Sequence, residues 1–200
     1  LNFNLLTEEN SKIESATMLA NEQLSWLNQQ LAKARSEHKK VIILQHEPFG
    51  INTYNVATGA QPTEPKYMVL NPTLQTQYLA VYANNNDIIN NYYYGHYHMD
   101  SIQVAANLFA FSTLAFNVDF DNNPGFKIIN LDQLGQLQDY TTYYSNFNNG
   151  SLLWQKLYSL NETYNIAPGN YVGYFSNFPG NQTLSEVNSY INYYNGYNMI

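Results

Sequence analysis

The 200-residue chain has no cysteine, few charged residues and no long apolar run. The absence of cysteine excludes disulfide bonds, thiolate zinc sites and cysteine nucleophiles. No window approaches the roughly 18 consecutive apolar residues of a membrane-spanning helix, so we expect no transmembrane segment. The 8 Lys and Arg residues against 15 Asp and Glu residues give a net charge of −7. This balance argues against a nucleic-acid polymer as a partner.

The chain also lacks an initiating Met and the basic start of a signal peptide. We therefore expect that it begins partway through a longer product. What it does contain is 44% hydrophobic residues, enough for one sizeable globular domain with or without a small appendage.

Apolar periodicity and turn residues predict the secondary structure. Leu24, Leu27 and Leu31 recur at helical spacing, and Asn71-Pro72 is typical of a helix start. The expected helices span residues 21–38 with Asn21 as N-cap, 71–86, 152–160 and 183–194. The expected strands span residues 41–44, 88–94, 101–111, 126–131 and 137–144, the last two joined by a hairpin turn at 132–135. Residues 49–70 are expected to form a long loop.

The order of these elements changes along the chain. Strands and helices alternate first, and a mostly helical tail is expected from about residue 148 onward. The pattern therefore predicts an α/β region over residues 1–147 and a helical C-terminal extension over residues 148–200.

Three of the four histidines follow apolar runs. His46 lies just beyond 41–44, while His96 and His98 follow the next expected strand and are introduced by Gly95. Neutral imidazole is the commonest metal ligand, and adjacent parallel strands bring their carboxyl ends to one crevice. The pattern predicts a metal site, although a solvated or hydrogen-bonded histidine pair remains an open alternative.

Other polar residues have weaker patterns. Asp100 and Asn117 are candidates for orienting a histidine, but a turn or surface role is favoured for both. Glu47 can face a substrate, but a solvent-facing acid is the favoured interpretation. His38 is expected to lie at a helix end, where it complements the helix dipole or is solvated. A convincing set of carboxylates for a two-metal centre is missing.

Two segments carry a family resemblance. Residues 41–50, Val-Ile-Ile-Leu-Gln-His-Glu-Pro-Phe-Gly, are followed by residues 94–101, Tyr-Gly-His-Tyr-His-Met-Asp-Ser. Together they resemble calcineurin-like metallophosphoesterases, and within these they are most similar to acid sphingomyelinase-like phosphodiesterases. Further similar segments are 23–27, 122–126 and the Tyr-rich tail from Trp154.

The resemblance implies the C-terminal half of a metallophosphoesterase β-sandwich flanked by helices, plus a helical C-terminal extension. It implies phosphodiester hydrolysis by two divalent metal ions, for which zinc is expected. His46 and His96 would hold one ion and His98 the other. Glu47, Tyr97 and Asn117 are candidates for contacting the substrate, a phosphodiester small molecule or a lipid headgroup. A secreted, periplasmic or lysosome-like location is also implied.

The departures from the family pattern are informative. The Asp-x-His, Gly-Asp and Gly-Asn-His motifs of the family's first half do not occur here. No catalytic residue is therefore assigned in this chain, because the leaving-group acid is expected in an N-terminal half of the same enzyme. That half is the expected partner, and the chain alone is expected to be inactive.

Two other functions remain open. The chain could be a non-catalytic partner subunit or degenerate homologue that keeps the fold for binding. Alternatively, the three histidines could hold one closed, structural metal ion.

Overall fold

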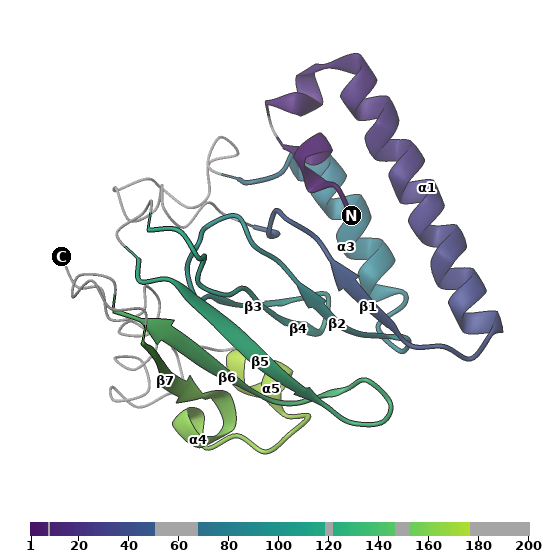
Figure 1. The fold of residues 1–200 in the computed structure, drawn as a ribbon. Helices are drawn as coiled ribbons and strands as arrows, with labels where there is room; N and C mark the ends of the chain where they lie inside the picture. The colour runs from purple at the N-terminus through teal and green to yellow at the C-terminus, as the bar shows by residue number, and fades with distance from the viewer. Residues whose placement is uncertain (8, 51–67, 119–121, 147–152, 177–200) are drawn as a thin grey trace. The chain divides into compact units, whose positions relative to one another are not determined.

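The computed structural model describes residues 1–7, 9–50, 68–118, 122–146 and 153–176. Its helices are α1 (Glu14–Ser36), α3 (Pro72–Ala83), α4 (Leu160–Tyr164) and α5 (Tyr171–Phe175), preceded by 3₁₀ turns at Phe3–Leu6 and Asn10–Lys12. Its strands are β1 (Val41–Leu44), β2 (Ile89–Tyr93), β3 (Ile102–Ala105), β4 (Leu108–Phe111), β5 (Gly125–Leu131), β6 (Leu137–Ser145) and β7 (Trp154–Ser159) (Figure 1). The chain divides into two compact units, residues 1–97 with 105–108 and residues 98–104 with 109–200. The expected mixed α/β class is confirmed.

The first unit is built on a parallel strand pair and two helices. β1 and β2 run parallel, with Val41 opposite Ile89. Helices α1 and α3 are joined by hydrogen bonds, since the Tyr78 hydroxyl donates to the Ala20 carbonyl oxygen at 2.9 Å and accepts from Gln23 at 3.0 Å. The parallel pairing places the carboxyl ends of β1 and β2 at the same edge.

The predictions for β1, β2 and α3 are confirmed. The Asn71 side chain caps α3 by accepting from the backbone N–H groups of Thr73 and Leu74 at 3.0 and 3.3 Å. Pro72 then occupies the first helical turn, where its missing N–H costs nothing. This helix start is encoded locally.

The expected start of α1 is wrong. The helix begins at Glu14, so Asn21 lies within it and is not the N-cap. The buried residues Ala16 and Ala20 extend the apolar stripe of Leu27 and Leu31 by two turns toward the N-terminus. Alanine is a weak signal for an apolar stripe because its side chain is small, although it is the best helix former.

Residues 101–111 form two strands rather than the single expected strand. β3 and β4 are neighbours in the sheet, and Ala106 and Asn107 connect them with φ values of 52° and 59°. Two consecutive positive φ values are typical of the type I′ turn, whose twist matches a β-hairpin. The apolar run therefore reverses direction at its centre.

The second unit contains the antiparallel sheet β5-β6-β7. The predicted hairpin turn between β5 and β6 is confirmed, because Asp132 accepts from the backbone N–H groups of Leu134 and Gln136 at 2.8 and 2.9 Å. Rings pack within this unit, with Phe111 of β4 4.5 Å from Tyr140 of β6 and Phe109 5.0 Å from Tyr171 of α5.

The helix expected over residues 152–160 is wrong. Residues 154–159 form β7, which pairs with β6 and buries Leu157 and Tyr158. The leucine spacing suits a helix, but pairing with the edge of β6 determines the structure. This pairing supplies partners for the backbone hydrogen-bonding groups and buries the apolar side chains of one strand face. The described part of the C-terminal extension is therefore one strand followed by the short helices α4 and α5. The fourth expected helix and most of the expected 49–70 loop lie outside the described residues, and the division at residue 147 stays a prediction.

None of the helices in the described ranges has the length and apolar content that a bilayer span requires.

Candidate metal centre

His46 and His96 occupy equivalent places after neighbouring parallel strands. His46 follows the end of β1 by two residues, and His96 follows the end of β2 by three. The backbone N–H of Gly95 donates to the His46 carbonyl oxygen at 2.9 Å, which ties the two loops together. The two imidazole rings have centroids 5.5 Å apart and meet nearly edge to face. The strand topology thus brings together two histidines that are distant in sequence.

Glu47 is the unexpected member of this group. Its side chain is buried, with the residue only 3% exposed, and its Oε2 atom lies 3.1 Å from Nδ1 of His96. Burial raises the pKa of the Glu47 carboxyl to about 7, because the low-dielectric surroundings disfavour its charged form. The expectation of a solvent-facing acid is therefore wrong.

A chain of hydrogen bonds holds the loop that carries Glu47. The Tyr82 hydroxyl of α3 donates to Gln45 Oε1 at 2.7 Å, and Gln45 Nε2 donates to the Glu47 carbonyl oxygen at 2.9 Å. Two residues later, the Phe49 ring packs against Tyr82 and Tyr92, with centroid distances of 5.2 and 5.8 Å. The loop is thereby fixed to both α3 and β2.

The next loop contains backbone strain. His96 and His98 have φ values of 75° and 61°, in the left-handed region that non-glycine residues rarely adopt. Such residues cost on the order of 1–3 kcal/mol each and cluster at functional sites. Gly95 has no positive φ, but a Cβ added there would lie 3.4 Å from His46 Nδ1. A side chain at this position would therefore contact the His46 ring at ordinary van der Waals distance.

Three side chains offer metal-ligand atoms within 4.8 Å of one another: those of His46, Glu47 and His96. This group could hold one cation, since two imidazoles and a carboxylate are a recurrent donor set for zinc. The sequence pattern identified both histidines but missed the carboxylate. The sequence does place Glu47 directly after His46 at a strand end. A loop that turns there can bring two adjacent side chains close to one ion.

Tyr97 belongs to the first unit, directly after His96. The Tyr97 ring lies 5.1 Å from the His96 ring. His98 and Asn117 belong to the second unit. The His98 carbonyl oxygen accepts from Ala115 N–H at 3.1 Å, and Asn117 is exposed. Roles for these three residues stay predictions.

Asp100 does not have the favoured turn or surface role. It is 2% exposed, and its Oδ2 accepts from Lys127 Nζ at 2.5 Å and from the hydroxyls of Thr142 and Tyr158, both at 3.0 Å. Lys127 Nζ also lies 4.3 Å from the centre of the Tyr140 ring, a cation–π distance. This buried ion pair fixes the strand β5 to the segment that follows His98.

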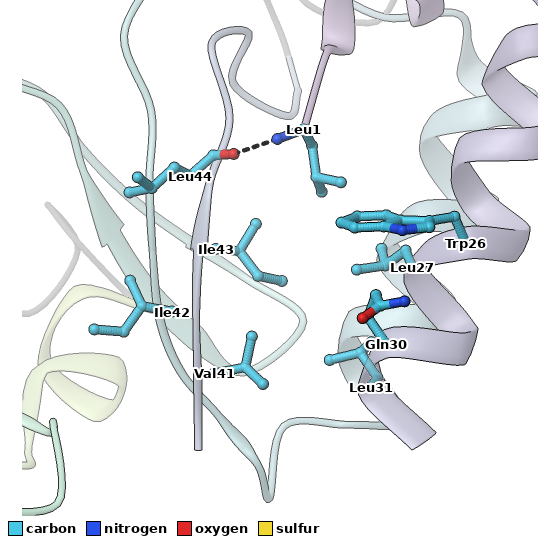
Figure 2. A pocket seen from close by; sticks show the side chains of 9 residues that line it. All are labelled: Leu1, Trp26, Leu27, Gln30, Leu31, Val41, Ile42, Ile43 and Leu44. Carbon is cyan, nitrogen blue, oxygen red and sulfur yellow. Dashed lines mark hydrogen bonds between the residues drawn. The ribbon is translucent and has the colours of Figure 1, made fainter. Parts of the chain in front are cut away.

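An apolar groove of about 260 Å³ lies between α1 and β1 in the first unit (Figure 2). β1 stands at one end of the strand order. The Leu1 ammonium donates to the Leu44 carbonyl oxygen at 2.6 Å. Trp26 is 53% exposed and Leu44 is 64% exposed. The lining residues are Leu1, Trp26, Leu27, Gln30, Leu31 and Val41 to Leu44.

The chain is 26% identical over 215 residues to human cyclic GMP-AMP phosphodiesterase SMPDL3A, a match covering 98% of this chain and 44% of that protein. It is 28% identical to the bovine protein of the same name, over 83% of this chain and 38% of the relative. It is also 28% identical to sphingomyelinase phosphodiesterase C of Dictyostelium discoideum, over 73% of this chain and 36% of the relative.

The chain is similar to acid sphingomyelinase-like phosphodiesterases. The names of these relatives describe them as phosphodiesterases or as a sphingomyelinase. No family model matches the chain. The chain spans less than half the length of these curated relatives.

Proposed function

We propose that this chain provides part of a two-metal centre that hydrolyses phosphodiesters. His46 and His96 hold one ion in this proposal, and His98 contributes to the second. The observation that carries the proposal is the convergence of His46, Glu47 and His96 after two parallel strands, with ligand atoms within 4.8 Å. The phosphodiesterase relatives support the same reaction class.

Zinc fits the imidazole-rich donors better than magnesium or calcium does. A pair of bound divalent ions supplies Lewis acidity and lowers the pKa of water. The chain's own residues orient these ions, while Tyr97 and Asn117 are proposed to contact the substrate. His46 is exposed and His96 is partly exposed, so the site is open, which supports a catalytic rather than a closed structural role.

The substrate class follows from chemistry that the relatives share. One relative is named for cyclic GMP-AMP and another for sphingomyelin, and both names denote cleavage of a phosphodiester. We propose a small phosphodiester or a lipid headgroup as the substrate of this chain's enzyme. A secreted, periplasmic or lysosome-like location belongs to the same proposal.

The proposed partner is an N-terminal half of the same enzyme that provides the bridging carboxylate and the leaving-group acid. The groove between α1 and β1 supports this partner (Figure 2). An added strand beside β1 would bury the Trp26 indole and the Leu44 side chain, which are both largely exposed. Strand addition to a free sheet edge combines backbone hydrogen bonds with apolar burial.

The test uses the chain joined to the proposed N-terminal half. We expect His46→Ala, His96→Ala and His98→Ala each to lower metal content and hydrolysis of bis(p-nitrophenyl) phosphate together, by about 100-fold in rate or more. His38→Ala is the matched control, because His38 lies outside the ligand group. Full activity of the His98→Ala protein would contradict the two-metal assignment. Two bound ions without hydrolysis would favour a degenerate, binding homologue.

A further inference from the structure

The Glu47 carboxylate has an unused oxygen beside two imidazoles. Its Oε2 atom is fully buried and has no hydrogen-bond partner among the described residues. The nearest basic atom is Nδ1 of His96, at 3.1 Å. A buried carboxylate without hydrogen bonds costs several kcal/mol unless a positive charge compensates it. The structure therefore provides a site for a cation at this oxygen.

The spacing of the side chains fits a single coordination shell. Two ligand atoms that are each about 2.1 Å from one zinc ion lie roughly 3 to 3.4 Å apart in octahedral or tetrahedral geometry. The 3.1 Å separation of Glu47 Oε2 and His96 Nδ1 is in this range. His46 offers the third ligand atom within 4.8 Å, and its exposed imidazole can turn to close the remaining distance.

We propose that Glu47 is a direct metal ligand, and that His46, Glu47 and His96 form a three-ligand zinc site that lies entirely within this chain. Two imidazoles and one carboxylate, with the fourth position open, constitute a recurrent arrangement for zinc. In this assignment Glu47 contacts the cation rather than the substrate.

The surroundings favour a preformed site. The Glu47 backbone is fixed through Gln45 and Tyr82, so the carboxylate is held in place before a cation binds. The two nitrogen donors select zinc over magnesium or calcium, which prefer all-oxygen surroundings.

This inference rests on the proposed pairing of His46 and His96, and it goes beyond the proposed function in one respect. The two-metal centre requires donors from an N-terminal half, whereas the three-ligand site requires none. The chain by itself should therefore bind one zinc ion.

The experiment is a zinc titration of the metal-free chain at pH 8 in competition with a chromophoric chelator, with circular dichroism to verify folding. We expect one zinc ion per chain, and about a 100-fold weaker affinity in both Glu47→Ala and Glu47→Gln. The matched control is His38→Ala, whose affinity should stay within about twofold of the wild type, because His38 does not belong to the ligand group. Magnesium should not compete.

Several outcomes would overturn the assignment. Wild-type affinity in Glu47→Ala would exclude Glu47 from the site. If Glu47→Gln kept the wild-type zinc affinity while Glu47→Ala lost it, residue 47 would act by hydrogen bonding to His96 instead of binding the ion. A larger loss in His98→Ala than in Glu47→Ala would place the first ion elsewhere. Failure of the proposed function is separable, because the joined enzyme would then fail to hydrolyse phosphodiesters while zinc binding by this chain still depended on Glu47.

Discussion

Two buried carboxylates, one in each unit, differ in how they are satisfied. Asp100 accepts hydrogen bonds from Lys127, Thr142 and Tyr158 in the second unit. Glu47 in the first unit has His96 beside it, while its Oε2 atom accepts no hydrogen bond from a described residue. Both follow a histidine, and both were expected at the surface.

The difference separates a structural group from a functional one. A carboxylate that accepts from an ammonium and two hydroxyls has most of its acceptor capacity filled and its charge compensated. A carboxylate that is equally buried but unsaturated retains that capacity and destabilises the empty site. Burial alone therefore does not identify a functional residue, whereas a buried carboxylate oxygen without a hydrogen bond makes its residue a candidate.

The largest expected effect comes from breaking the saturated pair. Lys127→Ala would leave Asp100 as a buried charge without its cation, so we expect a loss of about 3–5 kcal/mol in the free energy of unfolding. Urea denaturation of the chain measures this loss. Lys156→Ala is the control, because its ion pair with Glu162 is exposed and should contribute little. Equal effects in the two variants would show that the buried pair contributes no more to stability than the exposed pair does.

A smaller effect is expected from the unsaturated carboxylate, and it depends on pH. The pKa of Glu47 is about 7 in the fold against an ordinary value of 4.5, so the folded chain binds more protons than the unfolded chain between these values. Stability therefore falls as the pH rises from about 4.5 to 7, by about 3 kcal/mol at most.

Glu47→Gln removes this dependence. With a chelator present, the free energy of unfolding of the variant should exceed that of the wild type at pH 8. At pH 5 the two free energies should be nearly equal. Parallel stability curves for the two proteins would show that Glu47 is satisfied in the folded chain, as Asp100 is.

The smallest effect concerns the strained backbone. Because His96 has a φ of 75°, His96→Gly should be about 1 kcal/mol more stable than His96→Ala. At His46, where φ is not positive, the order should reverse, since glycine there only adds entropy to the unfolded chain. Thermal unfolding of the four variants tests the contrast. The same order at both positions would argue against strain at His96.

The elements predicted correctly are those whose information is local. The Asn71 cap and the apolar run of β1 each lie in a few consecutive residues, and the structure retains both. The histidines were identified because parallel strands bring their ends together by a general rule. Residues 154–159 were assigned wrongly because their leucine spacing suits a helix, and only the edge of β6 decides otherwise.

The carboxylates could not be assigned from the sequence because their burial depends on distant partners. Lys127 forms its ion pair with Asp100 only after β5 and the segment following His98 have packed together. Glu47 is buried because Tyr82, from a helix far along the chain, holds Gln45 and thereby the loop. No short window of sequence contains either relationship.

The parallel pairing of β1 with β2 has a consequence for the order of events in folding. A parallel pair requires a long crossover, which here includes α3, to close before the strands can meet. His46 and His96 are therefore far apart in the unfolded chain and meet only after this slow closure. Zinc uptake by the nascent chain should follow formation of the crossover. The ion would then stabilise the first unit after it has folded, and it would not nucleate folding.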